Sequence, residues 1–107
     1  MKLSAEQISQ SIAGFTDVVE LKLQADPSSG KYELTLALSD AQGKEVVLNC
    51  KDVSNLALSE VGGGLTQFLS LRAQDVSSQQ LDRVSFHFDD VERGTIHFDC
   101  ADANIDG

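Results

Sequence analysis

Apolar and polar residues alternate with a period of two along most of this chain, and this pattern constrains the fold more strongly than any other feature. The clearest run is 32–38, in which Tyr or Leu occupies every second position. Such alternation is typical of β-strands with one buried and one exposed face. Residue types that favour turns separate the first three runs. The runs before the last third of the chain are 18–23, 32–38, 46–50, 53–58 and 65–71.

The last third of the chain holds two more alternating runs, 83–88 and 95–100, joined by the acidic segment 89–94. Two such runs around a short polar connection predict a β-hairpin with one apolar and one polar face. Once the apolar residues of the two runs are paired, the register of the hairpin is set, and all of the remaining cross-strand pairs follow from it. The expected pairs are Phe88 with Ile96, Phe86 with Phe98 and Val84 with Cys100.

The first fourteen residues predict one short helix. Ser4 and Gln7 have the spacing of a capping box, and Leu3 and Ile8 have the spacing of a hydrophobic staple. Gly14 follows at the position where a left-handed residue commonly ends a helix.

One helix followed by about seven short strands predicts a mainly β protein. The pattern favours an antiparallel β-sandwich or a partly open barrel over a parallel sheet, which requires helices between the strands. The 107 residues are expected to form a single domain. Gly62-Gly63-Gly64 is expected to be a flexible connection, and 73–82 a long loop or helical turn. The expected parts are a helix at 3–14, antiparallel β-structure at 16–100 and an acidic tail at 101–107.

The net charge of −9 argues against a nucleic-acid partner, because phosphate binding depends on Lys and Arg. The absence of Trp and the single Tyr also remove most aromatic platforms for stacked bases. Residues 82–107 carry seven acidic and two basic side chains, a net of −5, whereas residues 1–81 carry ten and six, a net of −4. This concentration of negative charge predicts either a soluble surface or a face that attracts a basic protein.

The N-terminal residues lack an apolar leader, and no run has the length of a membrane span, so we expect a cytoplasmic bacterial protein without membrane partners. Cys50 and Cys100 end two expected strands on their apolar faces. A reducing compartment favours buried free thiols at both positions. A bridge would require the two strand ends to be neighbours, which the sequence does not establish.

Both histidines of the protein, His87 and His97, fall on the polar face of the expected hairpin. In the expected register they lie directly opposite each other, with Cβ atoms about 5 Å apart. Two imidazoles at that distance can share a Zn²⁺, Ni²⁺ or Cu²⁺ ion, and Asp99 or Asp89 can supply a carboxylate. The weak metal candidates are His87, His97 and Asp99, and the competing interpretation is a solvated face that contacts a partner.

Signatures of catalysis are missing from the sequence. The chain has no Gly-x-Ser-x-Gly nucleophile elbow, and neither cysteine has the sequence context of a catalytic nucleophile. The two histidines lie on an expected sheet face rather than on loops, where catalytic groups usually gather. We therefore expect no enzymatic activity and no cofactor.

The segments 46–56 and 88–100, the second ending in Phe98-Asp99-Cys100, resemble a strand–turn–strand pattern of small bacterial proteins. Proteins with this pattern are uncharacterised or resemble the immunity partners of polymorphic toxins, which are small, acidic, β-rich and non-enzymatic. The resemblance covers about the last 60 residues and implies no role for any particular residue.

The leading hypothesis is a non-catalytic, acidic protein-interaction module, of the immunity type, that binds a basic protein and is a monomer or weak homo-oligomer. One alternative is a metal-dependent sensor or small enzyme that uses the histidine hairpin. Another is a self-associating structural subunit that pairs through the strand at 65–71. The expected contact residues for a partner are His87, His97, Asp89, Asp90, Glu92 and Asp99.

Overall fold

The computed structural model describes residues 3–59, 71–79, 84–90 and 94–106. Within these ranges the chain forms one α-helix, one short 3-10 helix and eight strands, so the prediction of a mainly β protein with an N-terminal helix is confirmed. No helix of the described part is long and apolar enough to cross a membrane. The elements are α1 (Ala5–Ile12), β1 (Asp17–Asp26), β2 (Lys31–Ser39), β3 (Glu45–Lys51), β4 (Ser54–Leu58), β5 (Leu71–Asp75), η1 (Ser77–Gln79), β6 (Phe86–Asp90), β7 (Ile96–Cys100) and β8 (Asp102–Asp106).

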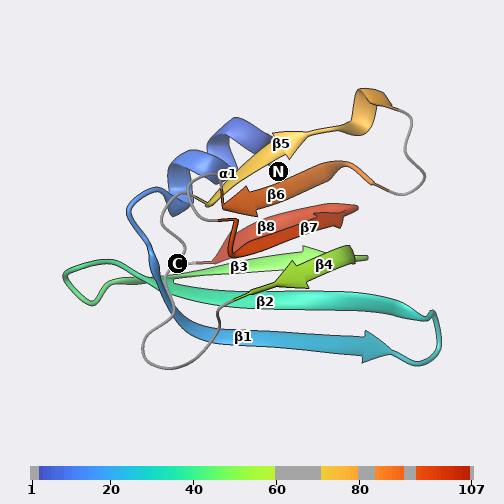
Figure 1. Ribbon diagram of the computed structural model, residues 1–107, viewed down its shortest axis with the longest axis horizontal. Coiled ribbons are helices and arrows are strands. Elements are labelled where there is room, and N and C mark those ends of the chain that lie inside the picture. Colours follow the sequence, from blue (N-terminus) through green and yellow to red (C-terminus); the bar gives the residue numbers. More distant parts are fainter. Residues whose placement is uncertain (1–2, 60–70, 80–83, 91–93, 107) are drawn as a thin grey trace.

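The strands form two antiparallel sheets of four strands each, as a sandwich requires. We call the sheet with order β1-β2-β3-β8 sheet A, and the sheet with order β4-β7-β6-β5 sheet B. Figure 1 shows that the axes of the strands in both sheets are nearly aligned. Helix α1 lies beside β5 at one edge of the molecule, and the β1–β2 hairpin lies at the other. The chain changes sheets between β3 and β4 and again between β7 and β8.

Large apolar side chains from both sheets fill the space between them. Phe88 and Phe98 are fully buried, and their rings stack with centroids 4.9 Å apart and planes 7° from parallel. Burial of side chains of this size supplies the main driving force for folding. The other fully buried apolar residues of the described part are Ile8, Leu34, Leu36, Leu38, Leu48, Cys50, Ile96 and Cys100.

The N-terminal capping box is present as predicted. The backbone N–H of Gln7 donates to Ser4 Oγ at 3.1 Å, and the backbone N–H of Ser4 donates to Gln7 Oε1 at 2.8 Å. Ile8 and Ile12 point into the core, which anchors the helix by its apolar face. Gly14, just past the helix, has φ +85°, the left-handed conformation that was expected there.

Ser9 links α1 to the edge strand of sheet B by two hydrogen bonds. Ser9 Oγ donates to the carbonyl oxygen of Ala73 at 3.2 Å and accepts from the N–H of Ala73 at 2.9 Å. Ala73 lies on β5, the edge strand against which α1 packs. Ser9 therefore satisfies backbone groups that an edge strand would otherwise present unpaired.

Several expectations about individual segments were wrong. Residues 71–75 form strand β5, although 73–82 was expected to be a loop or helical turn; of the described residues in that segment, 77–79 form the helical turn η1. Residues 102–106 form strand β8, which pairs with β3, where an acidic tail was expected. The Gly-rich connection and all but the last residue of the strand expected at 65–71 lie outside the described residues.

Strand β1 also departs from simple alternation. Val18 pairs with Leu38, but the register shifts before Glu20, which pairs with Ala37. A bulge of this kind re-aims the side chains of one strand. Val19, at this bulge, is 54% exposed, whereas Val18 is half-buried.

Candidate functional site

Strands β6 and β7 form the expected hairpin with its phenylalanines inward, but the predicted register was wrong by two residues. Phe88 pairs with Phe98, and Phe86 pairs with Cys100. A shift of two residues keeps every side chain on the same face of the sheet, so apolar alternation alone cannot distinguish the two registers. The face assignments are therefore confirmed, and the cross-strand pairs are corrected.

In the observed register each histidine lies opposite an aspartate on the outer face of sheet B. His87 pairs with Asp99, and Asp89 pairs with His97. The two histidines are diagonal neighbours, with ring centroids 6.4 Å apart and planes inclined by 35°. Each strand thus contributes one histidine and one aspartate. We call His87, Asp89, His97 and Asp99 the His–Asp cluster. The expectation that the two histidines lie directly opposite each other was wrong.

One side of the cluster is a hydrogen-bonded network. His87 Nδ1 lies 2.7 Å from Asp99 Oδ1, and Asn55 Nδ2 donates to Asp99 Oδ2 at 2.9 Å. Each oxygen of the carboxylate thus has its own partner, and the three side chains come from three adjacent strands of sheet B. Partners on both oxygens hold a carboxylate in one orientation and favour its ionised form.

The surroundings of Asp99 shift its pKa below the ordinary value. Partial burial acts to raise the pKa, but hydrogen bonds from Asn55 and His87, together with electrostatic interaction with His87 and His97, outweigh it. The Asp99 side chain is 17% exposed and that of His87 is 33% exposed. A negatively charged, oriented carboxylate is therefore presented at the surface near neutral pH.

The backbone at Asn55 explains how this residue reaches the network. Asn55 has φ +55°, in the left-handed region that asparagine tolerates better than most residues. The pairing of β4 with β7 shifts between Ser54 and Ala57, on either side of Asn55. Irregular backbone of this kind is concentrated at functional sites in proteins. Sequence analysis missed Asn55, because its contact with Asp99 spans 44 residues of chain and depends on how β4 and β7 pair.

The other side of the cluster carries a looser ion pair. Arg72 Nε lies 3.9 Å from Asp89 Oδ1, and the Arg72 side chain is 51% exposed. Exposed pairs at this distance are screened by solvent and contribute little to stability. The Asp89 side chain is 30% exposed, so its carboxylate lies close to the surface beside Arg72.

One residue of the expected contact set, Asp90, does not lie on this face. Asp90 is buried, at 2% exposure, because β6 continues to its position and the alternation of Phe86 and Phe88 directs it inward. It was expected in an exposed turn, and that expectation was wrong. Glu92 lies outside the described residues.

Acidic side chains of the last third of the chain are divided between the two sheets. Asp89 and Asp99 lie on sheet B, whereas Asp102 and Asp106 lie on β8 of sheet A. Asp106 Oδ2 accepts from Asn49 Nδ2 at 3.0 Å across the strands of sheet A. The single acidic face expected from the charge distribution is thus split, and the His–Asp cluster holds only part of it.

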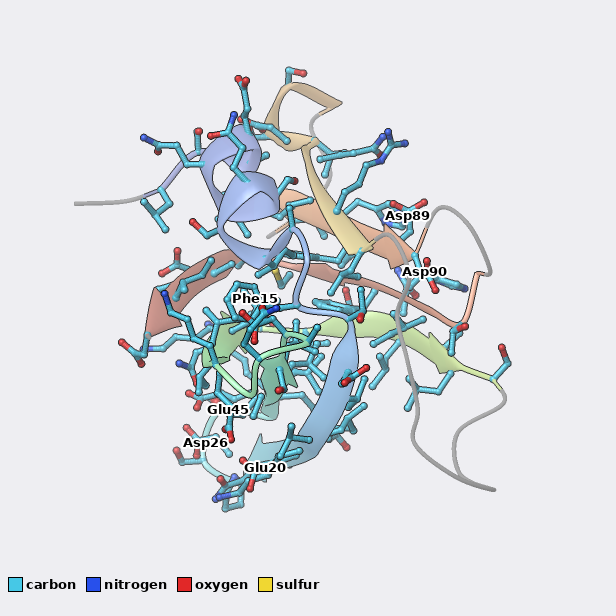
Figure 2. All side chains as sticks on the ribbon, turned by 90° about the vertical axis from the view of Figure 1, so that its left-hand side faces the viewer. Phe15, Glu20, Asp26, Glu45, Asp89 and Asp90 are labelled. Carbon is cyan, nitrogen blue, oxygen red and sulfur yellow. The ribbon has the colours of Figure 1, made fainter. Side chains whose placement is uncertain are left out.

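Figure 2 separates two groups of acidic residues in one view. Asp89 and Asp90 lie together at the end of β6, apart from Glu20, Asp26 and Glu45 on the strands of sheet A. Acidic residues therefore lie on strands of both sheets, and the cluster differs from the other acidic positions by its histidines and its ordered network.

The His–Asp cluster, all of whose residues are described, does not provide three metal ligands close to one another. Among the described residues, no group of three or more His, Cys, Asp or Glu side chains is close enough to hold a metal ion. The proposed ligands His87, His97 and Asp99 all lie in the described part, so together they do not form such a group. The Nδ1 atom of His87 already contacts Asp99.

An apolar pocket of about 370 Å³ lies next to the network, between sheet A and sheet B. Leu23 and Tyr32, each 46% exposed, form its wall on sheet A. Asn55 belongs both to this pocket and to the Asp99 network. Polar hydrogen-bonding groups and apolar area are therefore adjacent on this surface. The remaining lining residues are Val53, Ser54 and Leu56.

Comparison with protein families gives one match that covers almost the whole chain. The family model Immunity protein PIM8 matches residues 4–106, from the N-cap of α1 to the last described residue of β8. Comparison with curated proteins finds no match, and neither does comparison with solved structures. The resemblance to immunity partners of polymorphic toxins is confirmed, and the chain belongs to the PIM8 family of immunity proteins.

Proposed function

We propose that this protein is a non-catalytic inhibitor that binds a basic toxin protein through the outer face of sheet B. Its membership of an immunity-protein family carries this proposal, because such a family implies a protein partner. The net charge of −9 supports a partner with positive charge, since opposite charges accelerate association over long distances.

The His–Asp cluster is the part of this surface best prepared for a cationic partner. The Asp99 carboxylate is held by Asn55 and His87, so little side-chain entropy remains to be lost on binding. The next cross-strand pair on the same face is Asp89 with His97, and His97 is exposed. Lys or Arg side chains of the toxin would meet one carboxylate in a fixed position, that of Asp99, and a second carboxylate, that of Asp89, close to it.

The pocket of Leu23, Tyr32 and Leu56 would give the same interface its apolar part. Protein interfaces combine an apolar centre with a polar rim, and tyrosine is enriched among the residues that dominate binding energy. The pocket and the cluster share Asn55, so one toxin surface can cover both.

The test is the rate of association with the purified toxin, obtained by capture from the native host on the immobilised chain. The on-rate should fall at least about tenfold between 0.01 and 0.15 M salt, because screening shortens the range of attraction. The double variant Asp89→Asn, Asp99→Asn should associate several-fold more slowly than the wild type at low salt. Each variant must first show the far-UV circular dichroism of the wild type.

A matched control removes the same charge from sheet A. Glu20 and Glu33 are exposed on β1 and β2, so the variant Glu20→Gln, Glu33→Gln has the same net charge as the cluster variant. It should retain more of the wild-type on-rate than the cluster variant does. Equal losses in the two variants would assign the effect to net charge alone and reject the cluster as the contact face. An on-rate that ignores salt would reject the basic partner.

A further inference from the structure

Two buried cysteines face each other across the interior of the sandwich. Cys50 lies on β3 of sheet A, and Cys100 is the last residue of β7 in sheet B. Their exposures are 1% and 0%, and both belong to the hydrophobic core. Both are free thiols in the structure. The proposed toxin-binding function makes no use of either.

The change of sheet between β7 and β8 brings the two cysteines together. The residue after Cys100, Ala101, donates its N–H to the carbonyl oxygen of Lys51, the residue after Cys50, at 3.0 Å. Two residues further along, Ala103 pairs with Cys50 in sheet A. The backbone segments that carry the two thiols are therefore hydrogen-bonded to each other, and both side chains point inward.

The two thiols share one core cluster, and their surroundings affect the acidity of Cys50. Hydrogen bonding with the Cys100 side chain raises the pKa of Cys50 well above its ordinary value, and burial and electrostatic interaction with Cys100 and Asp102 raise it further. A raised pKa suppresses the thiolate, which is the form that attacks a disulfide. Cys50 should therefore react slowly while it is buried in the folded chain.

We infer that Cys50 and Cys100 are an oxidation site, at which an organic disulfide such as oxidised glutathione converts the two thiols into one disulfide between the sheets. One cysteine attacks the oxidant and releases the first glutathione thiol, and the other cysteine attacks this mixed disulfide and releases the second. The protein loses two protons and two electrons, and the oxidant gains both. The inference stands apart from the proposed toxin binding.

The bond would connect chain segments that are far apart in sequence. It closes the chain from residue 50 to residue 100, and a loop of that length restricts the unfolded chain strongly. Disulfides between the two sheets occur in other β-sandwich domains, where they lie in the core as this pair does. By thermodynamic linkage, the factor by which folding favours formation of the disulfide equals the factor by which the disulfide favours the folded state.

The experiment refolds the full chain in glutathione buffers of graded redox ratio, with and without denaturant. Refolding gives the oxidant access to both thiols before they are buried. After an acid quench and alkylation, intact mass counts the free thiols, the internal disulfides and the glutathione adducts. The internal disulfide should form at least about a hundredfold more favourably in the folded chain than in denaturant. The oxidised chain should melt about 10 °C above the reduced chain.

Single variants provide the control. Cys50→Ala and Cys100→Ala each keep one thiol, so they can form glutathione adducts or dimers but no internal disulfide. Equal formation of the internal disulfide in folded and denatured wild type would overturn the inference. So would a wild type that ends only as adducts or dimers in folding buffer, or an oxidised chain that melts below the reduced one.

Discussion

The Nδ1 atom of His87 lies 2.7 Å from Oδ1 of Asp99, and this contact joins the two central strands of sheet B on their outer face. Asn55 occupies the second oxygen of the same carboxylate from β4. Three of the four strands of sheet B thus contribute to one polar network above the buried Phe88–Phe98 stack. The network orders the surface that we propose for the toxin, and the stack fixes the strands that carry it.

The low pKa of Asp99 predicts a loss of stability in acid. The pKa in the folded chain lies below the unfolded value, which is about 3.9. The ionised carboxylate therefore stabilises the fold above that value, and the contribution disappears as the pH falls through the folded pKa. Asp99→Asn should lower the free energy of unfolding near pH 6 by less than about 1 kcal/mol, because the site is partly exposed to solvent.

Urea unfolding of wild type and Asp99→Asn, measured from pH 7 to pH 2, checks this prediction. The gap between the two chains should be largest above about pH 4 and should close below it. The same comparison is then made in the Asn55→Ala background, with and without Asp99→Asn. The gap should be smaller there, because Asn55→Ala removes one of the hydrogen bonds that favour the ionised form of Asp99. A gap of constant size across this range would show that Asp99 acts through packing and not through its charge.

Local patterns in the sequence predicted much of this fold. The Ser4–Gln7 spacing predicted the capping box, and period-two alternation predicted most strands and which of their faces is buried. These features depend on residues near each other in the chain, so single-sequence reasoning reaches them. Features that depend on pairing between distant segments were missed, and Asn55 is the clearest example.

The C-terminal strand carried a signal that its charges obscured. Ala103 and Ile105 alternate with Asp102, Asn104 and Asp106, which is the period of a strand. The segment has only two apolar residues, one of them small, and acidic residues are rare in strands. For both reasons the segment was assigned to a tail. Pairing with β3 overrides that weak preference, and Ala103 is buried as a result.

The stacked phenylalanines predict the largest single loss of stability. Phe88→Ala removes a fully buried ring whose space the stacked partner cannot fill, so it should lower the free energy of unfolding by about 3–5 kcal/mol. Denaturant unfolding of Phe88→Ala, Phe98→Ala and the double variant forms a cycle, in which the coupling between the rings should be about 1 kcal/mol. Leu58→Ala, at a 40% exposed position on β4, is the control and should change stability by roughly 0.5 kcal/mol or less. Strictly additive losses would mean that the rings do not interact beyond their burial.

The capping box predicts a smaller and localised effect. Ser4→Ala removes the oxygen that accepts from the Gln7 N–H, and should lower the free energy of unfolding by about 1 kcal/mol. Ser4→Asn restores an accepting oxygen and should recover most of this loss. Denaturant unfolding measures both variants, and hydrogen exchange should show faster exchange in the first turn of α1 for Ser4→Ala only. Equal stability of Ser4→Ala and wild type would mean that packing of Ile8 and Ile12 alone holds the helix.

Ser9 predicts a further effect at the edge of sheet B. Its hydroxyl bonds both the N–H and the carbonyl oxygen of Ala73, a buried residue on the edge strand β5. Ser9→Ala leaves both groups without this partner, and should lower the free energy of unfolding by about 1–3 kcal/mol. The amide of Ala73 should also exchange with solvent faster, which hydrogen exchange read out by NMR detects at this single residue.

Ser11→Ala is the matched control for Ser9→Ala, because it removes the same hydroxyl from the same helix. Ser11 Oγ donates only within the helix, to the carbonyl oxygen of Gln7 at 2.8 Å, on an exposed face. Alanine is the better helix former, so this variant should change stability by less than about 0.5 kcal/mol. Light scattering across concentrations adds a second comparison, since an uncovered strand edge promotes pairing between chains. Self-association that increases equally in both variants, or equal losses of stability, would show that Ser9 does not protect the β5 edge.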